Sequence, residues 1–168
     1  MELESLDELD TQIKLYQLGV KSFSPYANQS KVDMIIRTEV DEIIRYADIK
    51  VCTGVLKDDQ IVWKFAFSFF LKNESFIILS VRLPDKEGIM KKHYIIADSK
   101  SFLKIIKKEK IPIEENKWIL SVSYSSLQKL TEKKRSKKMS KLVKAIKPFF
   151  DNWDIFEEWK EDQTQSKS

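Results

Sequence analysis

The spacing of apolar residues predicts two helices at the start of the chain. From Leu3 to about Leu18 they recur at steps of three and four, as on one face of an amphipathic helix. The same spacing returns between Ser30 and Ala47. The first stripe is Leu3, Leu6, Leu9, Ile13 and Tyr16, and the second is Val32, Ile36, Val40, Ile43 and Ala47.

From Ile49 the hydrophobic period changes to two, which is the alternation of half-buried strands. The clearest strand is 60–72, where Trp63, Phe65, Phe67 and Phe69 share one face and are expected to form hydrophobic core. Weaker strands are predicted at 49–57, 76–83 and 89–97. The connections are short, so we expect these four strands to form an antiparallel meander.

The rest of the chain alternates again between helix and strand. Asp98 can cap a helix that ends before Pro112, and a fifth strand follows at 117–123. Two more helices are predicted at 136–147 and 151–160. The predicted fold class is α+β, with an antiparallel sheet of about five strands, a four-strand meander plus one, packed with N- and C-terminal helices. We expect one domain over 1–160 and a polar, disordered tail over 161–168.

Charge adds a candidate binding surface to this fold. The whole chain has a formal net charge of +4, yet the segment from Leu127 to Lys147 holds nine basic residues and a single acidic one, Glu132. A concentrated positive field favours an anionic partner such as nucleic acid. The predicted nucleic-acid-binding residues, here called the basic block, are Lys129, Lys133, Lys134, Arg135, Lys137, Lys138, Lys141 and Lys144, with Lys147 beside them.

Two other interpretations of the lysines stay open. The basic block can be a lysine-rich surface that only solvates an amphipathic helix. A second basic surface can lie on the open face of the 60–72 strand. That face carries Lys64, Ser68, Phe70 and Lys72.

Few residues are available for catalysis or metal binding. Cys52 is the only cysteine and His93 the only histidine. A zinc site with four Cys/His ligands is therefore excluded, and a catalytic Cys/His dyad would have no second cysteine or histidine to support it. We therefore expect no cofactor. One cysteine allows no internal disulfide, which fits the cytoplasm, and we expect no transmembrane segment. The carboxylates that can bind magnesium are Glu39, Glu42, Asp48, Asp85, Glu87 and Asp98, most of them expected at solvated surface.

The predicted order of elements resembles two known folds. A helix, three strands, a helix and a strand over about 30–123 resemble the core of restriction-endonuclease-like nucleases. That family needs an acid on one central strand and an acid-x-lysine on the next, whereas the strands matched to it read Ile-Val-Trp-Lys-Phe-Ala-Phe and Phe-Ile-Ile-Leu-Ser-Val-Arg. The resemblance therefore implies no catalytic residue. A double-stranded-RNA-binding domain has a similar order, with Lys100, Lys104, Lys107 and Lys108 near its lysine cluster but no matching loop histidine.

The sequence thus predicts a non-enzymatic nucleic-acid-binding or regulatory domain whose basic block contacts DNA or RNA phosphates. The alternative is a protein-binding module, an inhibitor or adaptor of a larger complex, without a nucleic-acid role. A third interpretation is a magnesium-dependent enzyme of phosphate chemistry. Oligomeric state does not follow from the pattern.

Overall fold

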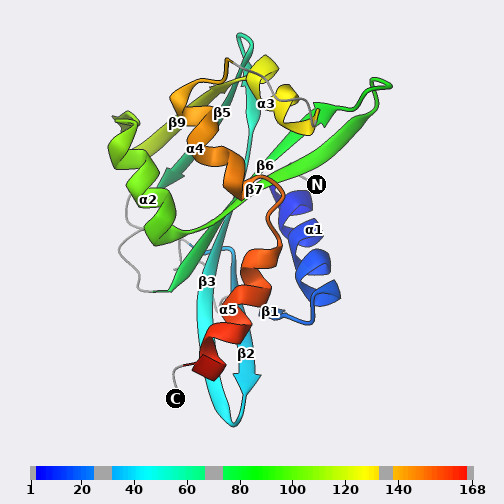
Figure 1. The fold of residues 1–168 in the computed structure, drawn as a ribbon, viewed down its shortest axis with the longest axis vertical. Helices are drawn as coiled ribbons and strands as arrows, with labels where there is room; N and C mark the ends of the chain where they lie inside the picture. Colours follow the sequence, from blue (N-terminus) through cyan, green and yellow to red (C-terminus); the bar gives the residue numbers. More distant parts are fainter. Residues whose placement is uncertain (1–2, 25–31, 67–73, 133–137, 166–168) are drawn as a thin grey trace.

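The computed structural model describes residues 3–24, 32–66, 74–132 and 138–165 (Figure 1). It begins with α1 (Leu3–Gln17), so the first predicted helix is confirmed. The face that this helix turns to the core is not the predicted one. Leu9, Ile13 and Tyr16 are 46%, 49% and 82% exposed, whereas Asp7 and Leu15 are buried.

The second predicted helix is wrong, because its residues form a β-hairpin of β2 (Met34–Val40) and β3 (Ile43–Thr53). The two-residue turn is Asp41-Glu42, and both residues have positive φ, 51° and 67°. Such turns match the twist of a hairpin. The segment is rich in isoleucine, valine and threonine, which favour strands, and its buried residues alternate along β2. The apolar residues of this segment thus fit the period of a helix as well as that of a strand. Pairing with the neighbouring strands selects the strand.

A mixed sheet of five strands runs through the centre of the molecule in the order β1-β2-β3-β6-β7. Its other members are β1 (Lys21–Phe23), β6 (Ser75–Pro84) and β7 (Met90–Asp98). The β3 and β6 strands pair in parallel, and the remaining neighbours are antiparallel. The α+β class is confirmed, but the four-strand antiparallel meander is wrong, because the strand around Trp63 leaves this sheet.

That strand belongs to a second, antiparallel sheet of order β4-β5-β9-β8. Its strands are β4 (Val55–Lys57), β5 (Gln60–Ala66), β8 (Ile113–Glu114) and β9 (Lys117–Ser123). The β5 strand pairs with β9 along its length. The predicted strands at 60–72 and 117–123 are therefore both present over the described residues, but they pair with each other.

Gly54 lies where the chain passes from the first sheet into the second. Its backbone N–H donates to the carbonyl of Ser80 at 2.9 Å. A Cβ atom here would lie 2.7 Å from Ile61 Cγ2 and 2.8 Å from Trp63 Nε1. These contacts are shorter than packed atoms tolerate, so the crossing between the sheets requires glycine.

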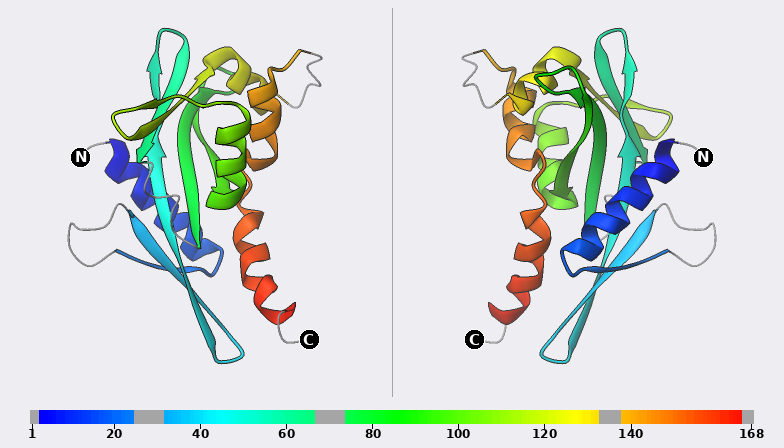
Figure 2. Two further views of the ribbon diagram at one scale, coloured as in Figure 1. Left: turned by 90° about the vertical axis from the view of Figure 1, so that its left-hand side faces the viewer. Right: turned by 90° about the vertical axis from the view of Figure 1, so that its right-hand side faces the viewer.

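Helices cover both faces of the five-stranded sheet (Figure 2). Together with α1, α5 (Asp154–Gln165) packs on one face, here called the α1/α5 face, where Leu15, Ile49, Ile78 and Phe156 form a core. Residues 161–165 of the predicted tail are thus helical. The opposite face, here called the second-sheet face, meets β5, β9 and the remaining helices. These are α2 (Ser99–Lys108), α3 (Tyr124–Thr131), α4 (Lys141–Ile146) and the short 3₁₀ helix η2 (Lys147–Phe149).

The core of the second-sheet face is aromatic. Trp63 and Phe65 are 0% and 1% exposed, and the rings of Phe65 and Phe102 lie 5.6 Å apart. The prediction that this strand face forms core is confirmed for these residues, while Phe67 and Phe69 lie outside the described residues. The predicted cap of α2 is confirmed as well, since Asp98 Oδ1 accepts the N–H of Ser101 at 2.9 Å. Within the described chain, none of the helices is long and apolar enough to cross a membrane.

Candidate active site

Asp33 and Lys50 form an ion pair at the start of β2. Asp33 Oδ1 accepts a hydrogen bond from Lys50 Nζ at 2.9 Å, and Asp33 Oδ2 accepts one from the backbone N–H of Val51 at 2.6 Å. The backbone N–H of Asp33 donates to the carbonyl of Ile49 at 2.9 Å. Three hydrogen bonds to β3 therefore hold Asp33 beside Lys50.

The pair is sheltered from solvent but can still be reached. The side chain of Asp33 is 12% exposed and that of Lys50 is 19% exposed. Charges in such partly buried places interact more strongly with one another, and with an anion that displaces water, than charges on an open surface do. The geometry is therefore suited to a polar ligand that enters from one side.

Asp48 belongs to the same group, because residues two apart on a strand project from the same face. Asp48 and Lys50 both project on the second-sheet face, the face on which Cys52 enters the core. Asp48 is paired with Ile35 of β2 and Ser75 of β6, so it lies within the sheet and not at its edge. Asp48, Ile49 and Lys50 thus form an acid-x-lysine on a central strand, and Asp33 supplies an acid immediately before the neighbouring strand β2.

This arrangement matches the acid and the acid-x-lysine of restriction-endonuclease-like nucleases, and it lies one hairpin earlier in the chain than the strands that the sequence pattern matches to that family. Sequence reasoning missed Asp33 and Lys50 because the segment was interpreted as a helix. On a helix, Asp33 would lie far from Lys50, which fell outside the predicted helix altogether. The tripeptide Asp48-Ile49-Lys50 was the signal that could have found the site.

The donor set fits a hard divalent cation. Over the described residues, no group of three or more His, Cys, Asp or Glu side chains could hold a metal ion. Magnesium does not need such a cage, since it is commonly bound by one or two carboxylates together with waters and substrate phosphate. Asp33 and Asp48 supply two carboxylates. Each oxygen of Asp33 accepts one hydrogen bond and retains acceptor capacity for a further partner.

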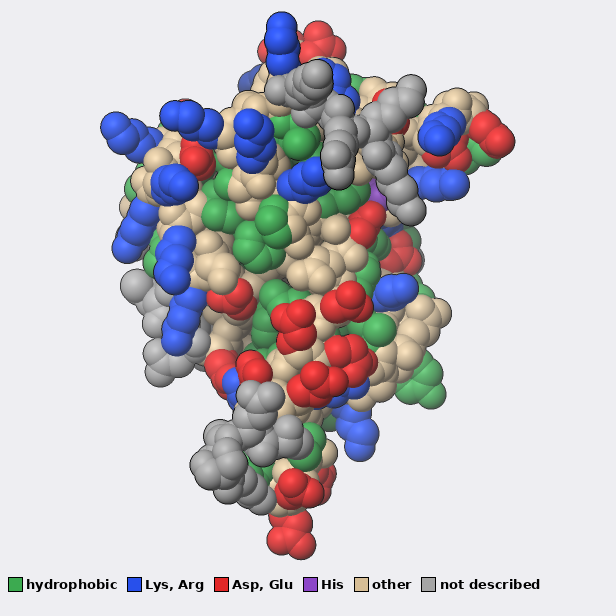
Figure 3. All heavy atoms as spheres, in the orientation of Figure 1, with side chains coloured by type: hydrophobic (Ala, Val, Ile, Leu, Met, Phe, Trp, Pro, Cys, Tyr) green, Lys and Arg blue, Asp and Glu red, His purple; other side chains and the backbone are tan. Residues whose placement is uncertain are grey.

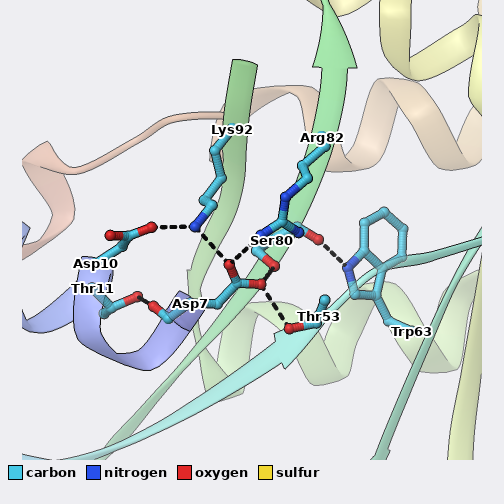
Figure 4. Close-up of polar contacts among 8 residues, drawn as sticks. All are labelled: Asp7, Asp10, Thr11, Thr53, Trp63, Ser80, Arg82 and Lys92. Atoms are coloured by element: carbon cyan, nitrogen blue, oxygen red, sulfur yellow. Dashed lines mark hydrogen bonds and ion pairs between the residues drawn. The ribbon is translucent and has the colours of Figure 1, made fainter. Parts of the chain in front are cut away.

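A second polar cluster lies under α1, on the α1/α5 face of the sheet (Figure 4). The side chain of Asp7 is fully buried and forms ion pairs with Lys92 at 2.7 Å and Arg82 at 3.1 Å. It also accepts hydrogen bonds from the hydroxyls of Thr53 and Ser80. All of these partners of the Asp7 side chain belong to the five-stranded sheet, so the network holds the polar face of α1 against the strands.

The electrostatics of this cluster agree with a structural role. Burial alone would raise the pKa of Asp7, but hydrogen bonds from Lys92, Ser80 and Thr53 outweigh it and hold the pKa below its ordinary value. Lys92 loses solvation too, yet Asp10 and Asp7 raise its pKa. Both groups therefore stay charged at neutral pH. The pairs explain why α1 can bury Asp7 while three of its apolar residues face solvent.

The other predicted carboxylates do not join Asp48. Glu39 pairs with Arg37 at 3.1 Å on β2, and Asp98 caps α2. Asp85 accepts the backbone N–H groups of Glu87 and Ile89 within the β6–β7 turn. His93 Nδ1 lies 2.7 Å from Asp151 Oδ2 and donates a hydrogen bond to this carboxylate. These residues are held by local structural contacts.

The described residues of the basic block lie on α3 and on or just before α4, away from the β2–β3 hairpin in the chain. Its described members, Lys129, Lys138, Lys141 and Lys144, are exposed, and 133–137 lie outside the described residues. Lysines gather over α2 and α4 in the upper part of the view in Figure 3, and acidic side chains gather below them over α5. The structure does not bring these lysines to Asp33 and Lys50. Contact between the basic block and nucleic acid stays a prediction.

Among the solved structures with a similar fold is that of a bacterial homing endonuclease, I-Ssp6803I. The TM-score is 0.58 at 10% sequence identity, and the match covers 97% of this chain and 94% of the endonuclease chain. No model of a known protein family and no curated protein sequence matches the chain. At this identity the likeness establishes a shared fold over nearly the full length of both proteins.

The comparison corrects the sequence-based interpretation of function. A non-enzymatic domain, whether nucleic-acid-binding or a protein-binding module, was expected, but the chain has the fold of an enzyme and carries an acid and an acid-x-lysine on adjacent strands. The interpretation as a non-enzyme is therefore wrong. The likeness gives no support to a regulatory role or a protein partner.

Proposed function

We propose that this protein is a divalent-metal-dependent endonuclease that hydrolyses phosphodiester bonds in DNA. The observation that carries the proposal is the 2.9 Å contact between Asp33 and Lys50, with Asp48 two residues before Lys50 on the same strand face. The shared fold with a homing endonuclease supports the same assignment.

Each side chain has a role that its position allows. Asp33 and Asp48 would hold the cation, which would supply an activated water and neutralise charge on the phosphate. Asp33 is kept in place by its bonds to β3, so its carboxylate needs little reorganisation before substrate binds. Lys50 has three N–H donors, of which Asp33 takes one.

In the proposed complex the Lys50 ammonium group donates a hydrogen bond to a non-bridging oxygen of the scissile phosphate while it stays paired with Asp33. The negative charge that grows on these oxygens in the transition state strengthens that bond. An ammonium group in a half-buried place is more effective in this respect than one in bulk water.

The proposal is tested by cleavage of supercoiled plasmid and of a genomic DNA pool by the purified full chain. We expect nicked or linear products with Mg²⁺ or Mn²⁺ and none with excess EDTA. Asp33→Asn, Asp48→Asn and Lys50→Met should each lower the cleavage rate by at least about 10²-fold, the usual cost of losing one transition-state contact. Glu42→Gln, at the exposed turn of the same hairpin, is the matched control and should leave the rate unchanged.

Circular dichroism of each variant checks that the fold is retained. Cleavage that survives in Asp33→Asn and Asp48→Asn would assign the activity to another site or to a contaminant. A wild-type chain that cleaves neither DNA substrate with either metal would overturn the proposal.

A further inference from the structure

A groove of about 800 Å³ separates the last residues of β3 from the open face of the second sheet. Three lysines line it, Lys57 on β4, Lys64 on β5 and Lys117 on β9, together with one carboxylate, Glu114. The hollow is thus positively charged.

The strand period explains why the lysines are on this face. In β5, Trp63 and Phe65 point into the core, so Lys64 between them points the other way. Lys57 and Lys117 are exposed and line the same hollow. None of the three forms an ion pair or a side-chain hydrogen bond with the residues that the structure describes. Their charge is therefore available to a ligand.

The groove begins close to the candidate active site. Cys52 and Thr53 of β3 line it, and Cys52 follows Lys50 by two residues along the strand. At about 3.3 Å per residue, the Cα atoms of these two residues lie roughly 7 Å apart. That is about the spacing of successive phosphates along one strand of nucleic acid, so a backbone lying in the groove reaches Lys50 within one or two nucleotides.

We propose that this groove binds the sugar-phosphate backbone of double-stranded DNA and leads it to Asp33, Asp48 and Lys50, an inference that rests on the proposed nuclease function. The charge complementarity is direct, because lysines contact phosphates without regard to sequence. The described lining holds no aromatic side chain, and Trp63 and Phe65 are buried on the opposite face of the sheet. A surface without aromatic residues offers unpaired bases nothing to stack on, which favours a duplex.

The basic block is the competing surface, and it lies across the core from the groove. The inner side of the second sheet packs in one core with Phe102 of α2 and Val143 of α4, so the exposed lysines of those helices face away from Lys64. In the left view of Figure 2 the β8–β9 turn lies on one side of the molecule, and α2 and α4 lie on the other. In Figure 3 acidic side chains gather over α5, below the lysines, and their negative charge weakens the positive field on that side of the molecule.

Two charge-matched variants distinguish the surfaces. The groove variant is K57Q/K64Q/K117Q, and the α4 variant is K138Q/K141Q/K144Q. Fluorescence anisotropy of a labelled 30-base-pair DNA duplex is measured with the full chain in EDTA, across about 50 to 300 mM salt, so that binding is separated from cleavage. All substituted lysines are exposed, and thermal denaturation confirms that both variants fold.

We expect the groove variant to bind on the order of 10²-fold more weakly at about 100 mM salt, with the slope of log K against log salt reduced by about 3. The variant K57R/K64R/K117R keeps the charge and should bind as the wild type does. An equal or larger loss in the α4 variant would overturn the inference, as would undetectable duplex binding by the wild type. Tighter binding of single strands or of duplex RNA would contradict the assigned occupant.

Cleavage measured in parallel separates this inference from the proposed function. If Asp33→Asn binds duplex DNA normally and the wild type does not cleave it, the nuclease assignment fails while the groove stands. If the wild type cleaves and the groove variant cleaves and binds equally well, the groove assignment fails while the nuclease stands.

Discussion

One carboxylate oxygen of Asp33 accepts a hydrogen bond from Lys50, and the other accepts one from the backbone N–H of Val51. The same side chain therefore extends the β2–β3 pairing and holds the ammonium group of Lys50 in place. Structure and chemistry depend on the same two hydrogen bonds. A substitution at this position should therefore affect stability as well as the proposed activity, and the choice of replacement can separate the two effects.

Asp33→Ala removes both hydrogen bonds and should lower the free energy of unfolding by about 2 kcal/mol. Asp33→Asn keeps an acceptor for Val51 and should cost about 1 kcal/mol, although both variants lose activity. Urea denaturation measures the difference. Equal losses of stability from the two substitutions would show that the bond to Val51 contributes nothing.

Asp7→Ala should be far more damaging, because it leaves Lys92 and Arg82 without their shared carboxylate. Removing one partner of a buried charge pair costs about 3–5 kcal/mol. Asp10→Ala is the control, since Asp10 also pairs with Lys92 but its side chain is 46% exposed, and its loss should cost less than about 1 kcal/mol. Chemical denaturation at pH 7 compares the two, and similar losses would contradict the anchoring role of Asp7.

The same network predicts sensitivity to acid. Asp7 has a pKa below its ordinary value of 3.8 in the folded chain, so its contribution to stability is complete above that value and is lost as pH falls toward the folded pKa. The stability difference between the wild type and Asp7→Asn should hold from pH 7 to pH 5 and shrink below about pH 4. Urea denaturation across that range measures it. A difference that stays constant down to pH 2.5 would contradict the lowered pKa.

The direction in which α1 faces can be tested with two substitutions on the one helix. Leu15 is fully buried, so Leu15→Ala should cost about 2–5 kcal/mol. Ile13 is 49% exposed, so Ile13→Ala should change stability by no more than about 0.5 kcal/mol. Thermal denaturation ranks them. The apolar stripe of the sequence predicts the reverse order, and finding that order would mean that the helix is turned the other way.

Gly54→Ala tests the crossing between the two sheets. The added methyl group would meet Ile61, Trp63 and the carbonyl of Ser80 at 2.7 to 2.8 Å, so we expect a loss of about 3 kcal/mol. Gly88→Ala is the comparison, because a Cβ there meets nothing within 4 Å and only its φ of +80° is unfavourable, at a cost of about 1 kcal/mol. Guanidinium denaturation measures both. A smaller loss at Gly54 than at Gly88 would contradict the close packing.

Local features of the fold were determined by the sequence. The cap at Asp98 and the strand at 117–123 depend on contacts within a few residues. The buried side of the strand at 60–66 was predicted for the same reason, because the alternation of large and polar residues has a single interpretation. Each of these follows from short-range periodicity and turn chemistry.

Long-range pairing was decided only by the tertiary structure. Apolar residues between 32 and 47 satisfy a helical and a strand period alike, and the adjoining strand β6 favours the second by pairing with β3. The antiparallel pairing of β2 with β3 brings Asp33 to Lys50, seventeen positions along the chain, and so forms the candidate site. Asp7 is buried for a comparable reason, since its partners come from β3, β6 and β7. Sequence periodicity reports which residues could be buried, but the partners that compensate a buried charge are brought together only when the sheet forms.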